Sequence, residues 1–388
     1  MSVLGLRTVV IGAGIGGLAV ARALALRGAD VTLLEQAAEI TEVGAGLQIS
    51  PNGMAVLRGL GLDTDVVAAS VQAQAVCLKD HHDALVVRLD LGRLPDPSYH
   101  FVHRADLIAL LADGARDAGV KIRLLQKVTE VEGGTHPVLH LANGAQMTAD
   151  LVVGADGLHS VLRPVLNGQD APFFTGQVAW RAIVPNTEGR GPEAWVHMGP
   201  GRHLVSYPLR DGAAINIVAV QERKAWADEG WNHSDDPANL RHAFADFGAP
   251  VRAMLERVTA PRLWGLFRHP VAKTWQRGHL ALLGDAAHPT LPFLAQGASM
   301  ALEDAWVLAD ALAGTDTVAA ALADYQSRRE KRVRRVISAA NGNAWKYHIR
   351  PAPLRRAAHT VMRLGGHFAP DRMMRQFDWL YTHDVTAK

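Results

Sequence analysis

Residues 6–24 read LRTVVIGAGIGGLAVARAL, and this stretch decides the fold class. Its β-branched, apolar start predicts a buried parallel strand. The glycines of a G-x-G-x-x-G motif follow at Gly12, Gly14 and Gly17. In such a motif the first glycine permits a tight turn, the second lets a pyrophosphate approach the backbone, and the third lets helix and strand pack closely. The helix predicted over 16–27 would offer its first amides to a phosphate.

A second strand completes this nucleotide-binding unit. GADVTLLEQ (28–36) ends in Glu35, at about the 20-residue spacing where an acidic side chain accepts hydrogen bonds from a ribose. A lone G-x-G-x-x-G is weak evidence, but the complete βαβ unit with its acidic end is strong. The unit by itself does not distinguish NAD from FAD.

Two later stretches repeat the pattern of a strand that runs into glycine. TADLVVGADGLHSVLR covers 148–163, and GDAAHPTLPFLAQGA covers 284–298 directly after the strand-like HLALL. A dehydrogenase that binds NAD has no obvious use for three such junctions. FAD is longer, and its adenosine, pyrophosphate, ribityl chain and ring each need a separate contact. The three junctions therefore favour FAD.

The composition limits the other classes of function. The chain has 388 residues, 48% of them hydrophobic, which suits two domains or one elaborated α/β domain. Lys and Arg (40) nearly balance Asp and Glu (38), which argues against a nucleic-acid partner. The single cysteine, Cys77, excludes an internal disulfide and a cysteine metal site; we expect a structural thiol, no metal and a cytoplasmic location. No export signal or membrane-length apolar run is visible, so we expect no integral membrane association.

Together the three junctions resemble the single-component FAD-dependent aromatic hydroxylases, which have the para-hydroxybenzoate hydroxylase fold. The salicylate, 6-hydroxynicotinate and 3-hydroxybenzoate hydroxylase branch is the most similar, and the resemblance extends to about residue 345. It implies that NADH or NADPH visits without a domain of its own, that O₂ reacts to give a flavin C4a-hydroperoxide, and that a phenolic or hydroxylated heteroaromatic acid is hydroxylated, with or without loss of CO₂. A monomer or a homodimer would suit this reading.

The resemblance also implies roles for individual residues. Arg104, in HRADL (103–107), matches an arginine along the FAD pyrophosphate. Asp156 falls in a motif associated with both FAD and the nicotinamide donor, although it could equally be a turn residue that stabilises its own loop. Asp285 matches an aspartate that binds the ribityl chain or ribose. The full cofactor-binding set is Gly12, Gly14, Gly17, Glu35, Arg104, Asp156, Asp285, and the backbone of Gln296, Gly297 and Ala298.

A strand-like stretch supplies the candidate catalytic pair. In RHLVSYPL (202–209) the alternation of a strand places His203, Val205 and Tyr207 on one face. A phenolate ring is a better nucleophile than a phenol, so a base with a pKa near neutral is useful here, and histidine is the default. The His-x-x-x-Tyr spacing also resembles the hydroxynicotinate and 3-hydroxybenzoate hydroxylases. The alternative is a structural histidine.

Further pocket residues follow from the same resemblance. Gln48, in AGLQISPN (45–52), could bind a substrate carboxylate or satisfy its own loop. Pro292 matches a proline beside the reactive edge of the flavin, where its fixed φ would shape the wall. Phe293 and Trp180 are candidates either for apolar pocket walls or for the core.

The predicted architecture is α/β: a Rossmann-type FAD-binding domain, an inserted antiparallel-sheet substrate domain and a C-terminal helical region. The boundaries follow the motifs: 1–75, 100–170 and 275–345 for the FAD-binding domain, 76–99 and 171–274 for the substrate domain, and 346–388 for the helical segment. Within the C-terminal part, the basic stretch 327–348 is expected to be a solvated helix face.

Three alternatives remain open. The chain could be a related flavin epoxidase, N-hydroxylase or quinone-biosynthesis hydroxylase with another substrate. A flavin halogenase fits less well, because WRAIVP (180–185) matches the signature of that class only in part. The non-enzymatic alternative is a flavin-binding redox sensor, against which the lack of a DNA-binding appendage argues.

Overall fold

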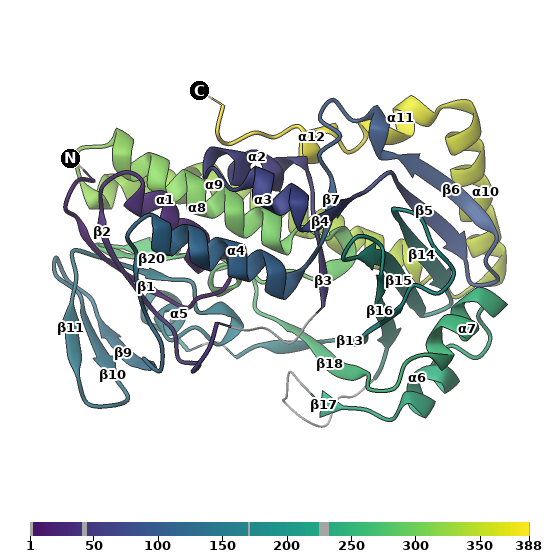
Figure 1. The fold of residues 1–388 in the computed structure, drawn as a ribbon, viewed down its shortest axis with the longest axis horizontal. Helices are drawn as coiled ribbons and strands as arrows, with labels where there is room; N and C mark the ends of the chain where they lie inside the picture. The colour runs from purple at the N-terminus through teal and green to yellow at the C-terminus, as the bar shows by residue number, and fades with distance from the viewer. Residues whose placement is uncertain (1–2, 41–44, 170, 225–232, 388) are drawn as a thin grey trace.

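Two large sheets organise the computed structural model, which describes residues 3–40, 45–169, 171–224 and 233–387 (Figure 1). One sheet has six strands and is mostly parallel, the other has eight and is mostly antiparallel, and the C-terminal part is helical. The predicted α/β fold class, with a Rossmann-type part, an antiparallel sheet and a helical C-terminal region, is confirmed.

The six-stranded sheet brings the three glycine junctions to one edge. Its order is β19-β20-β12-β1-β2-β8, and only β19 runs antiparallel to its neighbour. Ile11 pairs with Gly154, and Gly154 with Leu282. Since parallel strands end at the same edge, the turns that follow β1, β12 and β20 are neighbours. The strands are β1 (Arg7–Ile11), β2 (Asp30–Leu34), β8 (Lys121–Arg123), β12 (Leu151–Gly154), β19 (Gln276–Arg277) and β20 (Leu280–Leu282).

Helices cover this sheet and supply most of the main core. Helix α1 packs between α4 and α8, and its Leu18, Val20 and Leu24 are completely buried. The run of small residues in α1 lets these helices approach closely. The helices of this part are α1 (Ile15–Ala25), α2 (Pro51–Gly59), α3 (Asp63–Ala68), α4 (Arg104–Asp117), α5 (Leu162–Asn167), α8 (Gly297–Gly314) and α9 (Val318–Tyr347).

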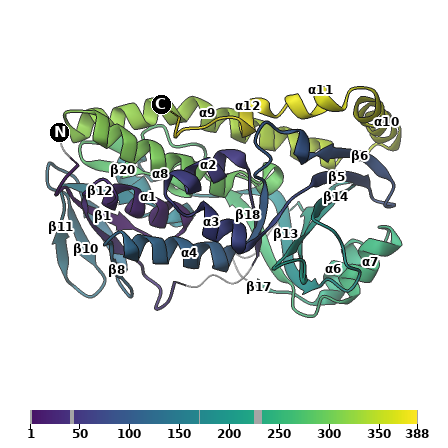
Figure 2. The same cartoon turned by 45° about the horizontal axis from the view of Figure 1, so that its top comes forward.

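The eight-stranded sheet has one face packed on its own helices. Its order is β17-β18-β13-β16-β15-β14-β5-β6, and only β14 and β5 are parallel. Trp180 and Leu204 pack with Phe244 and Phe247 in one apolar cluster. Helices α6 (Pro237–Ala243) and α7 (Ala249–Glu256) lie beside this sheet (Figure 2). The alternating residues therefore point to the opposite face, toward the first sheet. The strands are β5 (Ala75–Asp80), β6 (Leu85–Asp90), β13 (Phe173–Pro185), β14 (Glu193–Gly199), β15 (Arg202–Leu209), β16 (Ala214–Glu222), β17 (His233–Ser234) and β18 (Arg262–Arg268).

Smaller elements complete the chain. Helices α10 and α11 pack against β6 at the outer edge of the second sheet (Figure 2). The domain boundaries given above stay a prediction. The remaining elements are β3 (Gly46–Ile49), β4 (Ser70–Gln72), β7 (His100–His103), β9 (Val128–Glu132), β10 (Val138–Leu141), β11 (Gln146–Thr148), α10 (Ala352–Phe368), α11 (Pro370–Arg375) and α12 (Asp378–Tyr381), with 3₁₀ turns at Leu91–Arg93, Gly157–His159, Gly284–Ala286 and Pro292–Leu294.

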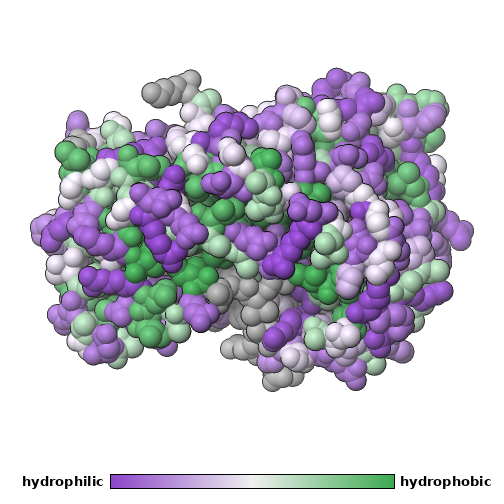
Figure 3. Space-filling view, in the orientation of Figure 1, coloured by the Kyte–Doolittle hydropathy of each residue, from purple (hydrophilic) through white to green (hydrophobic). Residues whose placement is uncertain are grey.

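The surface mixes hydrophilic and apolar side chains, and hydrophilic ones cover much of the face in Figure 3. Within the described part of the chain, no helix combines the length and apolarity needed to cross a membrane. Cys77 is buried on β5, where burial and the neighbouring Glu193 raise the pKa of its thiol to about 12. A thiol in that state is protonated and inert, as a structural role requires.

The basic stretch 327–348 is not simply a solvated face. Arg329 on α9 is completely buried, with Nε 2.7 Å from Oδ1 of Asp304, and it also binds Glu303 on α8. Arg332 binds the same Glu303 at 2.7 Å. The prediction is wrong at these positions because two buried carboxylates on α8 need cationic partners. The pairing fixes α9 against the helix that follows the third glycine junction.

Candidate active site

A cavity of about 1020 Å³ lies between the glycine edge of the first sheet and the open face of the second. Residues from all three junctions and from β15 form its wall. Most predicted site residues line it: Gly12, Gly14, Glu35, Gln48, Arg104, Asp156, His203, Tyr207, Asp285, Pro292, Gly297 and Ala298. Gly17, Gln296 and Phe293 are not among its lining residues. The cavity therefore joins the two groups of residues that the sequence suggested separately.

The first junction depends on two glycines that touch. Gly12 has φ of +99°, which only glycine adopts easily. A Cβ on Gly17 would lie 1.9 Å from the carbonyl oxygen of Gly12 and 3.3 Å from Cβ of Ala155. Gly17 thus acts by letting α1 meet the turn and not by lining the cavity. Gly14 is different, since a Cβ there would meet no atom within 4 Å.

Glu35 links the end of β2 to the glycine turn. Its carboxylate accepts the N–H of Ala13 at 2.8 Å and the N–H of Ala37 at 2.9 Å. A carboxylate has about four acceptor positions, so two of them remain for the hydroxyls of a ribose. The side chain therefore holds the turn and faces the cavity at the same time.

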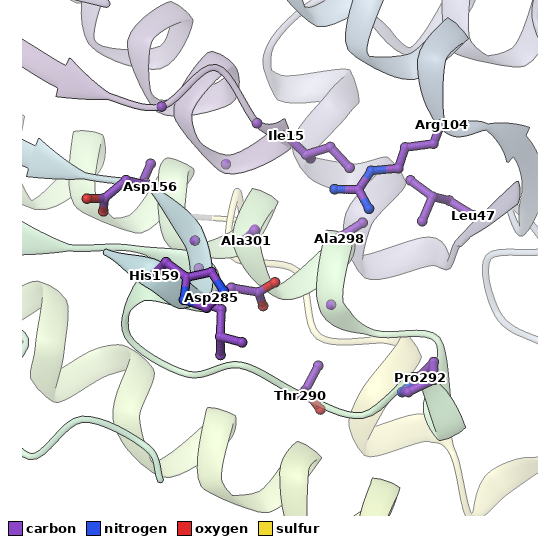
Figure 4. Close-up of a pocket in the computed structure, with 18 of the residues that line it drawn as sticks. Ile15, Leu47, Arg104, Asp156, His159, Asp285, Thr290, Pro292, Ala298 and Ala301 are labelled. Atoms are coloured by element: carbon purple, nitrogen blue, oxygen red, sulfur yellow. The ribbon is translucent and has the colours of Figure 1, made fainter. Parts of the chain in front are cut away.

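Arg104 and Asp285 reach the cavity from opposite sides (Figure 4). Arg104 begins α4, and its guanidinium extends between Ile15 and Ala298. Asp285 follows β20, and its side chain is open to the cavity while protein surrounds it elsewhere. This desolvation raises the pKa of Asp285, and the nearby charges of His288 and Arg104 oppose the rise. A cation and an acceptor thus stand ready for the phosphate and polyol parts of one ligand.

Asp156 makes the contacts of a turn residue. Its Oδ2 accepts the N–H of Val161 at 2.8 Å. Burial raises the pKa of its carboxyl, and hydrogen bonds from Ser160 and Val161 oppose that rise. Arg163 then joins this second junction to the third, since its guanidinium donates to the carbonyl of Ala286 at 3.1 Å. The second junction therefore shapes the wall as well as lining it.

A segment of the third junction, residues 284–298, runs along the cavity wall and is named the strap. Asp304 on α8 holds its start by accepting the N–H of Gly284 at 3.1 Å and contacting Nε2 of His288 at 2.6 Å. Near its end, the side chain of Gln296 donates to Oγ of Ser50 at 2.9 Å and points away from the cavity. Gly297 and Ala298 line the wall instead, and the backbone role predicted for this segment is compatible with that arrangement.

Phe293 does not form the cavity wall for which it was a candidate. It packs in a small apolar cluster with Leu291 and Val220, and its ring lies edge-on to the imidazole of His203, 5.3 Å between centroids. The φ of +51° at Ala295 turns the strap just after this residue. Phe293 therefore supports His203 from behind, while Pro292 faces the cavity.

Two residues of the second sheet were missed by the sequence reasoning. Arg181 on β13 and Trp264 on β18 line the cavity, with the guanidinium 5.2 Å from the indole centroid. The strand register Arg181–Val218–Val205 puts Arg181 on the same face as the candidate catalytic pair. Alternation in GQVAWRAIVP could have found it, because the neighbouring Trp180 faces the core, where its Nε1 donates to Asp235 at 2.6 Å.

Gln48 on β3 and Tyr207 on β15 both line the cavity. The hydroxyl of Tyr99 donates to Oε1 of Gln48 at 2.8 Å, so the amide NH₂ of Gln48 is the group available to a ligand. Tyr207 is buried, and burial raises the pKa of its phenol above the usual range. A neutral phenol at this position donates or accepts hydrogen bonds and does not act as a base.

His203 contributes a buried imidazole to the wall. Its Nδ1 lies 2.6 Å from Nε2 of His348, so Nε2 of His203 is the nitrogen available to a ligand. Burial, together with the charge of His348, lowers the pKa of His203 well below its usual value. The imidazole is therefore neutral near pH 7, and the near-neutral pKa that the sequence suggested for this base is wrong, because the cavity wall desolvates the ring. His348 follows α9, far along the chain, and nothing in the local sequence predicted this contact.

Comparison with known proteins identifies the family of the chain. Residues 6–340 match the model of an FAD-binding-domain family, described as "FAD binding domain". The 3-amino-4-hydroxybenzoate 2-monooxygenase of Streptomyces cremeus is 35% identical over 90% of this chain and 89% of its own length. The 3-hydroxybenzoate 6-hydroxylase of Klebsiella oxytoca is 34% identical over 97% and 96%.

A solved structure gives the same result for the fold. Klebsiella pneumoniae HpxO, complexed with FAD and uric acid, superimposes with a TM-score of 0.85 at 26% identity and covers 96% of each chain. The glycine turn, Glu35, Arg104 and Asp285 fit the parts of FAD as described above. The chain therefore belongs to this FAD-binding family and is an FAD-dependent aromatic monooxygenase.

Proposed function

We propose that the protein hydroxylates a phenolic or hydroxylated heteroaromatic acid with NAD(P)H and O₂, and that His203 is the base for the substrate hydroxyl. The observation that carries this proposal is the position of His203 and Tyr207 on the cavity face of β15, in the same cavity as Pro292 on the strap. A substrate between them would lie beside the proline and within reach of the imidazole.

The chain's own residues supply binding, orientation and proton handling. FAD, when bound, supplies the reduction of O₂ and the transfer of oxygen to the ring. Nε2 of His203 would remove the proton of the substrate hydroxyl, which makes the ring a stronger nucleophile. Tyr207 would hold the same hydroxyl by a hydrogen bond, and Gln48 would donate from its amide. The strap would exclude water from this end of the cavity.

Arg181 supports an acidic substrate. Two relatives are named for 3-amino-4-hydroxybenzoate and 3-hydroxybenzoate, which both carry a carboxylate and a hydroxyl on one ring. Arg181 brings a cation to the same sheet face as His203 and Tyr207. A guanidinium and a carboxylate form a charge-assisted pair, so we propose that Arg181 binds the substrate carboxylate.

A screen of monohydroxylated aromatic and heteroaromatic acids tests the proposed function. The acid that is the substrate is expected to stimulate NAD(P)H oxidation and to give a product heavier by one oxygen atom in mass spectrometry. The same assay compares NADH with NADPH and detects CO₂. Product formed only from alkenes, amines or quinone precursors would favour the related flavoenzyme alternatives, and an FAD spectrum insensitive to every acid would favour a redox sensor.

We also propose a cytoplasmic protein that acts as a monomer or a homodimer. The buried, protonated thiol of Cys77 and the absence of any other cysteine support a reducing compartment. Light scattering during gel filtration measures the oligomeric state, and cell fractionation measures the location.

A further inference from the structure

A continuous chain of hydrogen bonds leads away from the candidate base. Nδ1 of His203 on β15 lies 2.6 Å from Nε2 of His348, and Nδ1 of His348 lies 3.0 Å from Oε1 of Glu222 at the end of β16. Nη2 of Arg350 completes the chain at 2.6 Å from Oε2 of the same glutamate. The paired strands β15 and β16 contribute one group each, and the segment after α9 contributes two, His348 and Arg350, to a single row.

The row runs from the cavity to the surface. His203 is 1% exposed and His348 is 4% exposed, while the side chains of Glu222 and Arg350 are 33% and 64% exposed. Phe293 and Tyr347 pack their rings beside His203, with centroids at 5.3 and 5.2 Å. Apolar and aromatic groups therefore enclose the inner part of the row, and its outer end reaches water.

The hydrogen bonds fix where the protons reside. Burial disfavours the charged form of Glu222, but hydrogen bonds from Arg350 and His348 outweigh it and lower the pKa of the carboxyl. An ionised carboxylate only accepts, so Nδ1 of His348 carries a hydrogen and its Nε2 is an acceptor. His203 must then donate from Nδ1. Its Nε2 is left without a hydrogen, which is the tautomer a base requires.

We propose that His348 and Glu222 form a proton relay that carries the substrate hydroxyl proton from His203 to solvent. This inference rests on the function proposed above. The substrate O–H bond breaks as its proton bonds to Nε2 of His203. The Nδ1 proton of His203 moves to Nε2 of His348, the Nδ1 proton of His348 moves to Glu222, and Glu222 releases a proton to water. No electron leaves or enters the row.

The environment of His203 explains why a relay is useful. Burial and the adjacent His348 disfavour its imidazolium form, and burial also lowers the pKa of His348 against the opposing effect of Glu222. The titratable and charged groups around the pair are Tyr347, Glu222 and Arg350. A proton taken from the substrate is thus unstable at His203 and has a hydrogen-bonded path to water through His348 and Glu222.

Proton release measures the relay without turnover. The oxidised FAD-loaded enzyme, without NAD(P)H, is mixed with 3-amino-4-hydroxybenzoate or 3-hydroxybenzoate in weak buffer with a pH-indicator dye. We expect His348→Gln and Glu222→Gln to slow proton release roughly tenfold or more, with Kd for the acid changed less than about twofold. Imidazole added to His348→Ala should restore the rate. His359→Gln, which replaces a buried histidine of α10 outside the row, should release protons at the wild-type rate.

The outcomes separate the relay from the proposed function. Wild-type proton release in both His348→Gln and Glu222→Gln, with release abolished in His203→Gln, would overturn the relay and leave the base in place. Slow release in His348→Ala that imidazole does not restore would also count against the relay, since a structural defect gives that result. A wild-type enzyme that binds no hydroxylated aromatic acid would overturn the proposed function itself. FAD content and thermal melting identify any variant that fails to fold.

Discussion

The two ends of the cavity are built in different ways. At the cofactor end, glycines and backbone groups at the ends of β1, β12 and β20 form the wall, and Gly17 contacts Gly12 with no room for a Cβ. At the substrate end, side chains on one sheet face form the wall, and Nδ1 of His203 lies 2.6 Å from Nε2 of His348. The substitutions that the cofactor end tolerates are limited by steric room, and those that the substrate end tolerates are limited by the positions of protons and charges.

This difference determines which changes each end tolerates. A side chain added at Gly12 or Gly17 meets backbone atoms, which cannot move without distorting the turn. At the substrate end an amide of similar shape fits where an imidazole or guanidinium was, and only the chemistry changes. Substitutions that add volume should therefore damage the first end, and substitutions that preserve volume should damage the second.

The largest effect is expected from Gly17→Ala. The new Cβ would lie 1.9 Å from the carbonyl oxygen of Gly12, so the turn and α1 must separate. Overpacking usually costs about 1–3 kcal/mol, and a clash with backbone should exceed that. Purified protein should lack FAD and melt at a clearly lower temperature, as measured by flavin absorbance and calorimetry.

Two matched glycines provide the controls. Gly14→Ala should keep the fold but weaken FAD binding, because its Cβ meets no protein atom and enters the cavity. Gly342→Ala, within α9 and also without close neighbours, should not lower stability and should leave FAD bound. If Gly17→Ala and Gly342→Ala retain the same amount of FAD, steric room does not determine which substitutions the cofactor end tolerates.

At the substrate end, His203→Gln should slow hydroxylation about 100-fold or more, within the range for loss of a general base. FAD should stay bound, since His203 contributes to the other end of the cavity. More of the NAD(P)H consumed should appear as hydrogen peroxide, which a peroxidase-coupled assay measures. Unchanged coupling of NAD(P)H consumption to product would remove His203 from the mechanism.

The segments that line the cofactor end could be found from the sequence because their determinants are local. A strand, a glycine turn and the start of a helix lie within about 20 residues of one another, and each of the three junctions shows this pattern. The parallel pairing of β1, β12 and β20 then brings the junctions together. Gly17 and Gln296 are instructive here, because both belong to their motifs and yet act by packing or by bonding Ser50.

The substrate end was predicted only in part because it depends on contacts that are distant in sequence. Alternation along β15 was enough to pair His203 with Tyr207. Arg181 needs the register across β13, β16 and β15, and His348 needs the path of the chain after α9. The wrong prediction of a solvated position for Arg329 has the same cause, since the burial of Arg329 depends on carboxylates of α8. A one-dimensional pattern carries none of this pairing information.

Arg181→Gln sharpens the comparison at the substrate end. Loss of a charge-assisted hydrogen bond of about 1.5–3 kcal/mol corresponds to roughly a tenfold or greater rise in KM for the acid. The affinity for the matching phenol without a carboxylate should not change. Arg210→Gln, at an exposed arginine that follows β15, is the control. Equal losses for the acid and the phenol would show that Arg181 acts on something other than the carboxylate.

The smallest effect is expected from Asp285→Asn, which separates stability from binding at the cofactor end. The protein around the enclosed side of Asp285 raises the pKa of its carboxyl in the folded apoprotein, so ionising it costs stability. That cost is absent below the carboxyl's unfolded pKa, near 3.9, grows as the pH rises to the folded value, and is complete above it. Because the side chain is also open to the cavity, solvent screens much of this cost. At neutral pH the apoprotein of Asp285→Asn should therefore melt at or slightly above the wild-type temperature, and any gain should vanish toward about pH 4. FAD affinity should fall severalfold, because a charged acceptor is lost.

Asp113→Asn, at an exposed position of α4, controls for the change in net charge. A lower melting temperature for the apoprotein of Asp285→Asn would mean that the carboxylate stabilises the turn without FAD. Steric room would then not be the only property that determines which substitutions the cofactor end tolerates.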